Sequence, residues 1–363
     1  MKVNIFGKRK TLALAVSLAS TSGMSSAQVM DEIIVTAGKR EQSAQDIPYN
    51  ISVMSGDRME SLGIKDSNAL LRAIPGLTSF DEGPRVGGSR NNLQMRGLNV
   101  NTASNEDDNP MISQATVSTY LGEVPLYFPM KLFDLNRVEV LRGPQGTLYG
   151  AGSVGGTVKF MPNKPSFEET TLKLSAEISS TDHAGDPGTD LSVEANVPIN
   201  DKLAFRGTLG RETQSGFIDA VQLVAQEGTS RNTGPIVLAD PSDILGSPAA
   251  SAESIEDFNE STQNYLRASL LATPTERLKV GLNVNYQEIE LDGRYEHNPS
   301  FGSGENYKDY TAHIDPSDGE MMLIDVDVEV DLGFARLTSS TALAEMDSFS
   351  VSDSSGFLRT NLP

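Results

Sequence analysis

Three glycines, Gly150, Gly152 and Gly155, stand in the order G-x-G-x-x-G within the segment Leu148–Phe160. In a dinucleotide-binding turn this spacing lets the backbone approach a pyrophosphate at the N-terminus of a helix. The residues that follow are Gly156, Thr157, Val158, Lys159 and Phe160, with prolines at 162 and 165. β-Branched residues followed by proline favour a strand and then a break, so no helix is expected there. The glycine spacing is therefore interpreted as accidental, and no nucleotide site is predicted.

Residues of the kinds used in catalysis or metal binding are scattered along the chain. The histidines are His183, His297 and His313, and their spacing suits no shared metal ion. The chain has no cysteine, so neither a disulfide nor a thiolate metal site is possible. No Ser/His/Asp order, paired catalytic carboxylates or phosphate loop is found. The sequence predicts no enzyme, no metal site and no cofactor.

The N-terminus has the three parts of an export signal. Basic residues between Lys2 and Lys10 precede a short apolar run over 11–19, and Ser25-Ser26-Ala27 supplies a small-residue cleavage site. We predict a signal peptide over residues 1–27, with an amphipathic helix as the alternative. The net charge is −20, so nucleic acid is not an expected partner.

From residue 166 onward, apolar and polar residues alternate with a period of two. The run Leu172, Leu174, Ala176, Ile178 is followed by similar runs up to Leu343, which together predict about seven strands. Short turns at 198–202 and 273–277 alternate with long polar stretches at 213–261 and 288–320. A soluble sandwich would also alternate, but this loop pattern and a charged second face favour a membrane barrel. The charged face is clearest at Asp325, Asp327, Glu329 and Asp331.

Residues 46–165 instead mix helical and strand patterns, which indicates an α+β region. A first short helix is expected to be capped by Ser55 or Asp57 and to end at Gly63. A second is expected to begin after Asp66 or Ser67 and to stop at Pro75-Gly76.

Several motifs in this region resemble the plug domain of TonB-dependent outer-membrane receptors. The family pattern V-E-V-L-R-G-P, L-Y-G and G-G-x-[VI] is matched at 138–144, 148–150 and 155–158. Four further stretches resemble plug elements in the family's order: Asp46–Gly63, Asn68–Leu77, Leu93–Asn99 and Val117–Tyr127. The resemblance implies an α+β plug domain (46–165) followed by an antiparallel transmembrane β-barrel, of which 166–363 would be the N-terminal part. It also implies a location in the outer membrane of a Gram-negative bacterium, in contact with lipid.

The segment between signal peptide and plug, the leader 28–45, contains Asp31–Arg40, which resembles the TonB box of this family. Its β-branched residues favour extended structure that a partner sheet can add as a strand. The resemblance implies that a TonB-type protein of the inner membrane binds here; the alternative is a disordered tail without function. The leader is expected to be flexible. The box residues are Glu32, Ile33, Ile34, Val35, Thr36 and Ala37.

The resemblance also suggests anchoring and ligand residues. Arg96-Gly97 and Arg142-Gly143 are expected to tie the plug to barrel carboxylates. In candidate outer loops of the plug, Arg85 and Arg90 could hold an anionic chelate or pair with the acidic barrel wall. Asp107 and Asp108 could bind a hard cation, although a solvated acidic loop is the simpler interpretation.

The implied function is TonB-energised uptake of a scarce nutrient, without any reaction on it. A ferric siderophore or other iron complex is the leading cargo, and cobalamin, glycans and aromatic compounds remain open. A surface-binding β-protein without transport is the alternative of another class. A barrel that encloses a plug has about 22 strands, whereas residues 166–363 predict about seven, so we expect a longer receptor of which this is the first part.

Overall fold

The structure is a computed structural model. Its two main β-sheets have seven and five strands and are called here the long sheet and the smaller sheet. It describes residues 34–40, 42–43, 45, 47, 50–64, 70, 73–79, 93–98, 116–127, 130–224, 252–295, 307–310 and 314–351. Within these residues no helix is long and apolar enough to cross a membrane.

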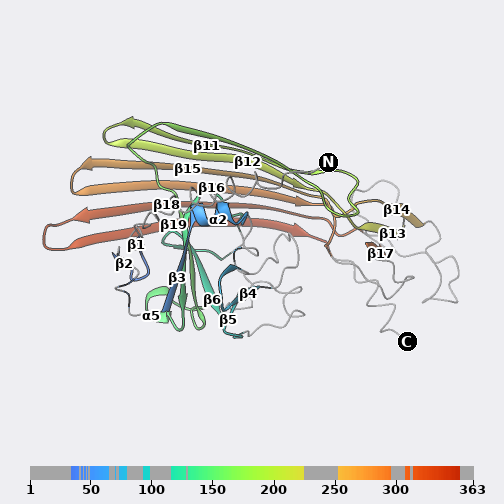
Figure 1. Cartoon of the computed structure of the whole chain (residues 1–363), viewed down its shortest axis with the longest axis horizontal. Helices are drawn as coiled ribbons and strands as arrows, with labels where there is room; N and C mark the ends of the chain where they lie inside the picture. Colours follow the sequence, from blue (N-terminus) through green and yellow to red (C-terminus); the bar gives the residue numbers. More distant parts are fainter. Residues whose placement is uncertain are drawn as a thin grey trace, which may run out of the picture.

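The long sheet contains seven strands, as the two-residue period predicts. Neighbours pair antiparallel in the order β10-β11-β12-β15-β16-β18-β19, and Figure 1 shows them side by side above the rest of the chain. The strands are β10 (Thr171–Ser179), β11 (Gly188–Asn200), β12 (Leu203–Gln214), β15 (Ser261–Thr275), β16 (Leu278–Leu291), β18 (Ser317–Asp331) and β19 (Arg336–Ser350).

The two faces of the long sheet differ as expected. Apolar side chains such as Leu172 and Leu343 lie exposed on one face. The other face is largely polar and lies against the smaller sheet, so that Arg267 and Asp325 are buried there. A polar inner and an apolar outer face is the arrangement of a membrane barrel wall.

The connections of the long sheet also follow the predicted alternation. Two residues separate β11 from β12 and β15 from β16. The long connections on the opposite side carry a three-stranded sheet in the order β14-β13-β17. These strands are β13 (Asp219–Val224), β14 (Ala252–Ile255) and β17 (Lys308–Tyr310).

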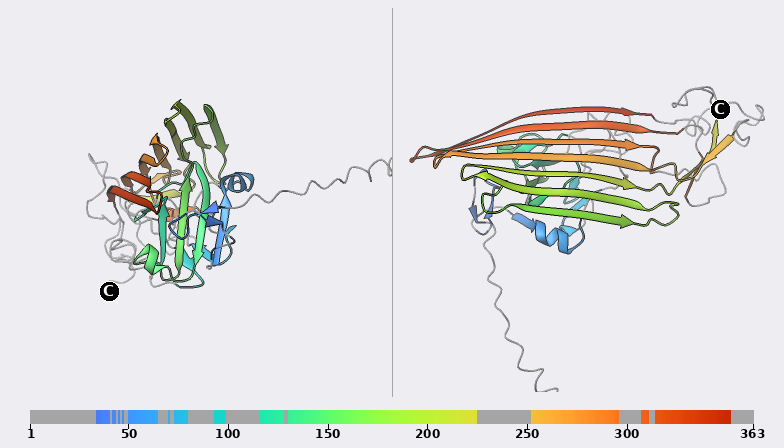
Figure 2. Two further views of the ribbon diagram at one scale, coloured as in Figure 1. Left: turned by 90° about the vertical axis from the view of Figure 1, so that its left-hand side faces the viewer. Right: turned by 90° about the horizontal axis from the view of Figure 1, so that it is seen from above.

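The smaller sheet is the centre of the α+β region and lies beneath the long one (Figures 1 and 2). Its order is β3-β8-β9-β6-β7, with β6 and β9 parallel. The strands are β3 (Asn50–Ser55), β6 (Val117–Leu121), β7 (Val124–Pro125), β8 (Leu135–Arg142) and β9 (Gly156–Pro162). A separate pair is formed by β4 (Leu77–Ser79) and β5 (Leu93–Met95).

Two short helices with both ends in the described part of the chain accompany this sheet. Helix α2 (Gly56–Ser61) begins where expected, because the side chain of Ser55 accepts a hydrogen bond from the Arg58 N–H. Helix α5 (Gly146–Tyr149) lies between β8 and β9. The second predicted helix falls largely outside the described residues, although Leu70 and Ala73 are helical.

The strands β8 and β9 explain the glycine-rich stretch. β9 begins at Gly156, directly after the G-x-G-x-x-G pattern, so the predicted strand replaces the helix that a nucleotide site requires. A Cβ on Gly156 would lie 2.3 Å from the carbonyl oxygen of Leu141. The glycine is needed for close packing of strands.

Candidate functional site: the docked N-terminal segment

Residues 34–40 and 42–43 pack on the smaller sheet, with two short strands paired as in a hairpin. Strand β1 (Ile34–Val35) pairs with β2 (Gln42–Ser43). Val35 and Ala37 are fully buried, in one cluster with Leu141 and Tyr149. The prediction of a flexible leader is therefore wrong for these residues, because the side chains of Val35 and Ala37 are buried in the core beside the smaller sheet.

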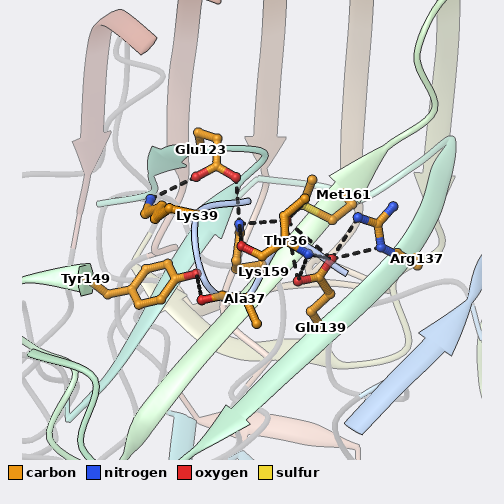
Figure 3. A network of polar contacts seen from close by, with 9 residues as sticks. All are labelled: Thr36, Ala37, Lys39, Glu123, Arg137, Glu139, Tyr149, Lys159 and Met161. Carbon is orange, nitrogen blue, oxygen red and sulfur yellow. Dashed lines mark hydrogen bonds and ion pairs between the residues drawn. The ribbon is translucent and has the colours of Figure 1, made fainter. Parts of the chain in front are cut away.

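The buried carboxylate of Glu139 holds the segment at Thr36. Glu139 lies in the middle of β8 and is 0% exposed. Its two oxygens accept hydrogen bonds from the Thr36 backbone N–H at 3.0 and 3.1 Å, and the Thr36 hydroxyl lies 3.3 Å away. Arg137 balances the charge from the same strand at 2.8 Å. Figure 3 shows these groups converging on Thr36.

A buried lysine contacts Thr36 from the neighbouring strand. Lys159 on β9 stands beside Glu139 in the strand register and is 0% exposed. Its ammonium group donates to the Thr36 hydroxyl (2.9 Å) and carbonyl oxygen (3.3 Å). It also pairs with Glu123 at 2.6 Å, and Glu123 pairs with Lys39 at 2.8 Å. The segment thus lies between charges of both signs.

Burial and neighbouring charges shift the pKa values of Lys159 and Glu123. Burial lowers the pKa of Lys159, and the nearby carboxylates of Glu123 and Glu139 only partly oppose this. Burial would raise the pKa of Glu123, but Lys159 and Lys39 outweigh it, so that this pKa lies below its ordinary value. The Glu123 carboxylate is accordingly held ionised by its two lysines.

Two tyrosines complete the contact. The Tyr149 hydroxyl donates to the carbonyl oxygen of Ala37 at 2.8 Å, and the Tyr120 hydroxyl donates to the carbonyl oxygen of Tyr149 at the same distance. The rings meet edge to face with centroids 5.1 Å apart, and the Lys39 ammonium lies over both.

This arrangement binds backbone groups of the N-terminal segment. The N–H of Thr36 and the carbonyl oxygens of Thr36 and Ala37 all have partners within the plug. A strand from another protein needs the same groups for pairing. Docking on the plug and pairing with a partner sheet through these groups are therefore mutually exclusive. Among the described residues, no group of three or more potential ligands could hold a metal ion.

The structure brings together only part of the predicted site. Ile34, Val35, Thr36 and Ala37 lie in the docked segment. Glu32 and Ile33 lie outside the described residues, as do the proposed ligand residues Arg85, Arg90, Asp107 and Asp108. Sequence reasoning missed Glu139 and Lys159. The available signal was a charged residue between two apolar ones in each strand, Val138-Glu139-Val140 in β8 and Val158-Lys159-Phe160 in β9.

The arginines predicted to anchor the plug differ from expectation. The Arg142 guanidinium donates to Asn50 (3.0 Å), Ser52 (2.7 Å) and the carbonyl oxygen of Pro75 (2.7 Å), all within the plug. The partners of the Arg142 guanidinium lie in β3 and in the turn before β4. These bonds therefore join two parts of the plug and do not join the plug to the barrel. Arg96 lies exposed in a turn at φ 55°, followed by Gly97 at φ 74°, and Gly143 has φ 100°.

The sequence profile described as TonB-dependent Receptor Plug Domain matches residues 43–157, which hold four strands of the smaller sheet and the first two residues of the fifth, β9. Residues 43–157 are a plug domain of the TonB-dependent receptors. The long sheet is therefore part of the receptor barrel, and the protein resides in the outer membrane of a Gram-negative bacterium.

Two relatives and one solved structure illustrate the receptor family. An iron-regulated outer membrane virulence protein of Vibrio cholerae is 28% identical over 207 residues, 56% of this chain and 30% of the relative. A hemin receptor of Yersinia enterocolitica is 33% identical over 153 residues, 41% of this chain and 21% of the relative. The ferric yersiniabactin uptake receptor of Yersinia pestis superposes with a TM-score of 0.58 at 18% identity, covering 84% of this chain and 42% of that one. The chain spans less than a third of the length of these two relatives.

Proposed function

We propose that this receptor takes up a scarce nutrient with energy from a TonB-type protein, and that the cargo is an iron complex such as a ferric siderophore. The proposal divides the chain into a signal peptide (1–27), a leader with the TonB box (28–45), a plug (46–165) and the first part of the barrel (166–363). The receptor carries out no reaction on its cargo.

The observation that carries the proposal is the docked segment itself. Residues 34–37 have the composition of an added strand, yet their polar backbone groups are held by Glu139, Lys159 and Tyr149. Such a segment suits a role in which it leaves the plug and pairs with a partner sheet. A pull on the paired strand would then pass directly into the plug.

The cargo assignment is supported by the relatives. The names of three compared proteins refer to iron regulation, hemin and ferric yersiniabactin. Other relatives of similar identity, from Vibrio cholerae and Vibrio vulnificus, are named vitamin B12 transporters. Cobalamin, glycans and aromatic compounds remain alternatives, because the proposed ligand residues fall outside the described part of the chain. We propose Arg85, Arg90, Asp107 and Asp108 as the plug residues to test for ligand contact.

Uptake can be measured with the receptor expressed from its gene in a Gram-negative strain that lacks its own iron receptors. We expect accumulation of radioactive iron from a ferric siderophore or from hemin. This accumulation should be lost in Val35→Pro, because proline has no backbone N–H with which residue 35 could pair with a partner strand. A strain without the TonB-type protein is the second control. Uptake of labelled cobalamin alone would contradict the cargo, and binding without any uptake would favour a surface-binding protein.

A further inference from the structure

A five-residue segment, Met130–Asp134, joins the plug to the barrel wall. It lies directly before β8, and its residues contact four successive wall strands, β11, β12, β15 and β16. We infer that this segment is a fixed joint: under force on residues 34–37, the chain before residue 130 leaves the plug sheet while β8 and β9 stay on the wall. The source of that force rests on the proposed function; the joint itself does not.

Asp134 is the strongest part of the joint. Its side chain is 1% exposed and accepts two hydrogen bonds from the Arg206 guanidinium, at 2.7 and 2.5 Å. Its carbonyl oxygen accepts a bond from Arg267 at 3.1 Å. Arg267 is itself buried and donates to Asn285 at 2.9 Å. Bidentate, buried pairs of this kind are the ones that resist separation.

Lys131 makes a second set of bonds. Its ammonium group pairs with Asp190 at 3.1 Å and with Glu212, and it lies 4.6 Å from the ring centroid of Tyr265. Its backbone N–H donates to the side chain of Gln287 at 2.7 Å. Each of the four strands contributes at least one of these partners.

Apolar contacts fill the space between the polar ones. The ring of Phe133 packs on Tyr265 at 4.6 Å between centroids and on the Arg267 guanidinium at 4.7 Å. Met130 packs against Ile289 and Met321 of the wall, whereas Leu132 belongs to the plug core. The segment therefore holds wall and plug core at once.

The order of the plug strands determines what such a joint would retain. β8 and β9 lie in the middle of the sheet, and the chain segments before residue 130 supply both flanks: β3 on one side, β6 and β7 on the other. A pull on residues 34–37 reaches β3 first, and β3 is an edge strand bonded only to β8. Both flanks can thus be removed before the force reaches the joint.

Single-molecule force spectroscopy on the full chain in a lipid nanodisc tests this without cargo or partner. Residues 1–363 contain no cysteine, so Ile34→Cys and Phe334→Cys give unique attachment points within them, and any cysteine elsewhere in the receptor is replaced by serine. Phe334 is 88% exposed in the turn after β18. If extension stops at the joint, the chain released between residues 34 and 130 measures roughly 320–350 Å. Release through residue 165 would measure roughly 430–470 Å.

We expect the shorter extension, followed by a separate rupture at higher force. The isosteric Asp134→Asn, and the double variant K131A/D134A, should shift the population toward the longer extension. Lys173→Ala is the matched control, because Lys173 forms an exposed plug–wall pair with Glu60. Release of the whole plug in one step from the unaltered receptor would overturn the inference, and so would an unchanged stopping point in both joint variants. Neither outcome bears on whether the receptor transports iron.

Discussion

The Glu139 carboxylate accepts the backbone N–H of Thr36 across 103 residues of sequence, inside the plug and out of contact with water. A buried carboxylate is costly unless it is paired and fully hydrogen-bonded. Thr36, Arg137 and the adjacent Lys159 provide that compensation. The stability of Glu139 in the plug and the docking of the N-terminal segment therefore depend on each other.

Replacing Glu139 with glutamine is expected to undock the segment. The amide keeps the shape but loses the charge, and hydrogen bonds to a charged group contribute about 1.5–3 kcal/mol. A spin label on Ile34→Cys should become more mobile in Glu139→Gln, as measured by electron paramagnetic resonance. Glu60→Gln is the matched control, since Glu60 makes an exposed ion pair whose loss costs little. Equal label mobility in the two variants would argue against the account.

Tyr149→Phe removes one hydrogen bond and leaves the ring in place. The Ala37 carbonyl oxygen, in a fully buried residue, then lacks the 2.8 Å bond from the hydroxyl. We expect docking to weaken by about 1 kcal/mol, with a smaller gain in label mobility than in Glu139→Gln. An effect as large as that of Glu139→Gln would mean that the tyrosine, not the carboxylate, holds the segment.

Acid is expected to release the segment. The pKa of Glu123 lies below its ordinary 4.5, so its pairs with Lys39 and Lys159 stabilise docking above that pH and are lost as the pH falls through the lowered value. The spin label should gain mobility as the pH falls below 4.5.

Glu123→Gln provides the comparison for this titration. Without the carboxylate, the label should already be more mobile at pH 7 and should change less on acidification. An identical acid transition in both proteins would assign the effect to other groups.

Gly156→Ala is expected to prevent correct plug folding. The added Cβ would lie 2.3 Å from the Leu141 carbonyl oxygen and 2.4 Å from the Met95 sulfur. Since Leu141 belongs to β8, the backbone itself would have to move, which predicts a loss of several kcal/mol. Protease resistance of the plug measures this. Gly63→Ala is the control, because no atom lies within 4 Å of its added Cβ and its positive φ costs only about 1–2 kcal/mol.

The parts of the fold that depend on local periodicity could be predicted from the sequence. The two-residue alternation predicted seven long strands with one polar face, and β-branched residues after Gly155 predicted β9 in place of a helix. Of the two residues proposed to cap the first helix, Ser55 and Asp57, the structure shows Ser55 as the cap. In each case neighbours along the chain determine the outcome.

The parts that depend on distant contacts could not be predicted. Nothing near Thr36 in the sequence indicates that Glu139 and Lys159 form hydrogen bonds with it, and nothing near Asp134 indicates its bonds with Arg206 and Arg267. Arg142 was expected to reach the barrel because a following glycine permits close approach. Its described bonds are to Asn50, Ser52 and Pro75, since β3 and the turn before β4 lie nearer.

The most direct test of the docking account is the affinity of the purified receptor for the C-terminal domain of a TonB-type protein. If docking and partner pairing compete for the Thr36 backbone, the apparent Kd includes the cost of undocking. We predict that Glu139→Gln binds about tenfold tighter or more, which corresponds to at least 1.4 kcal/mol of lost docking energy. An unchanged or weaker affinity in Glu139→Gln, with the control Glu60→Gln behaving as the unaltered receptor, would contradict the account.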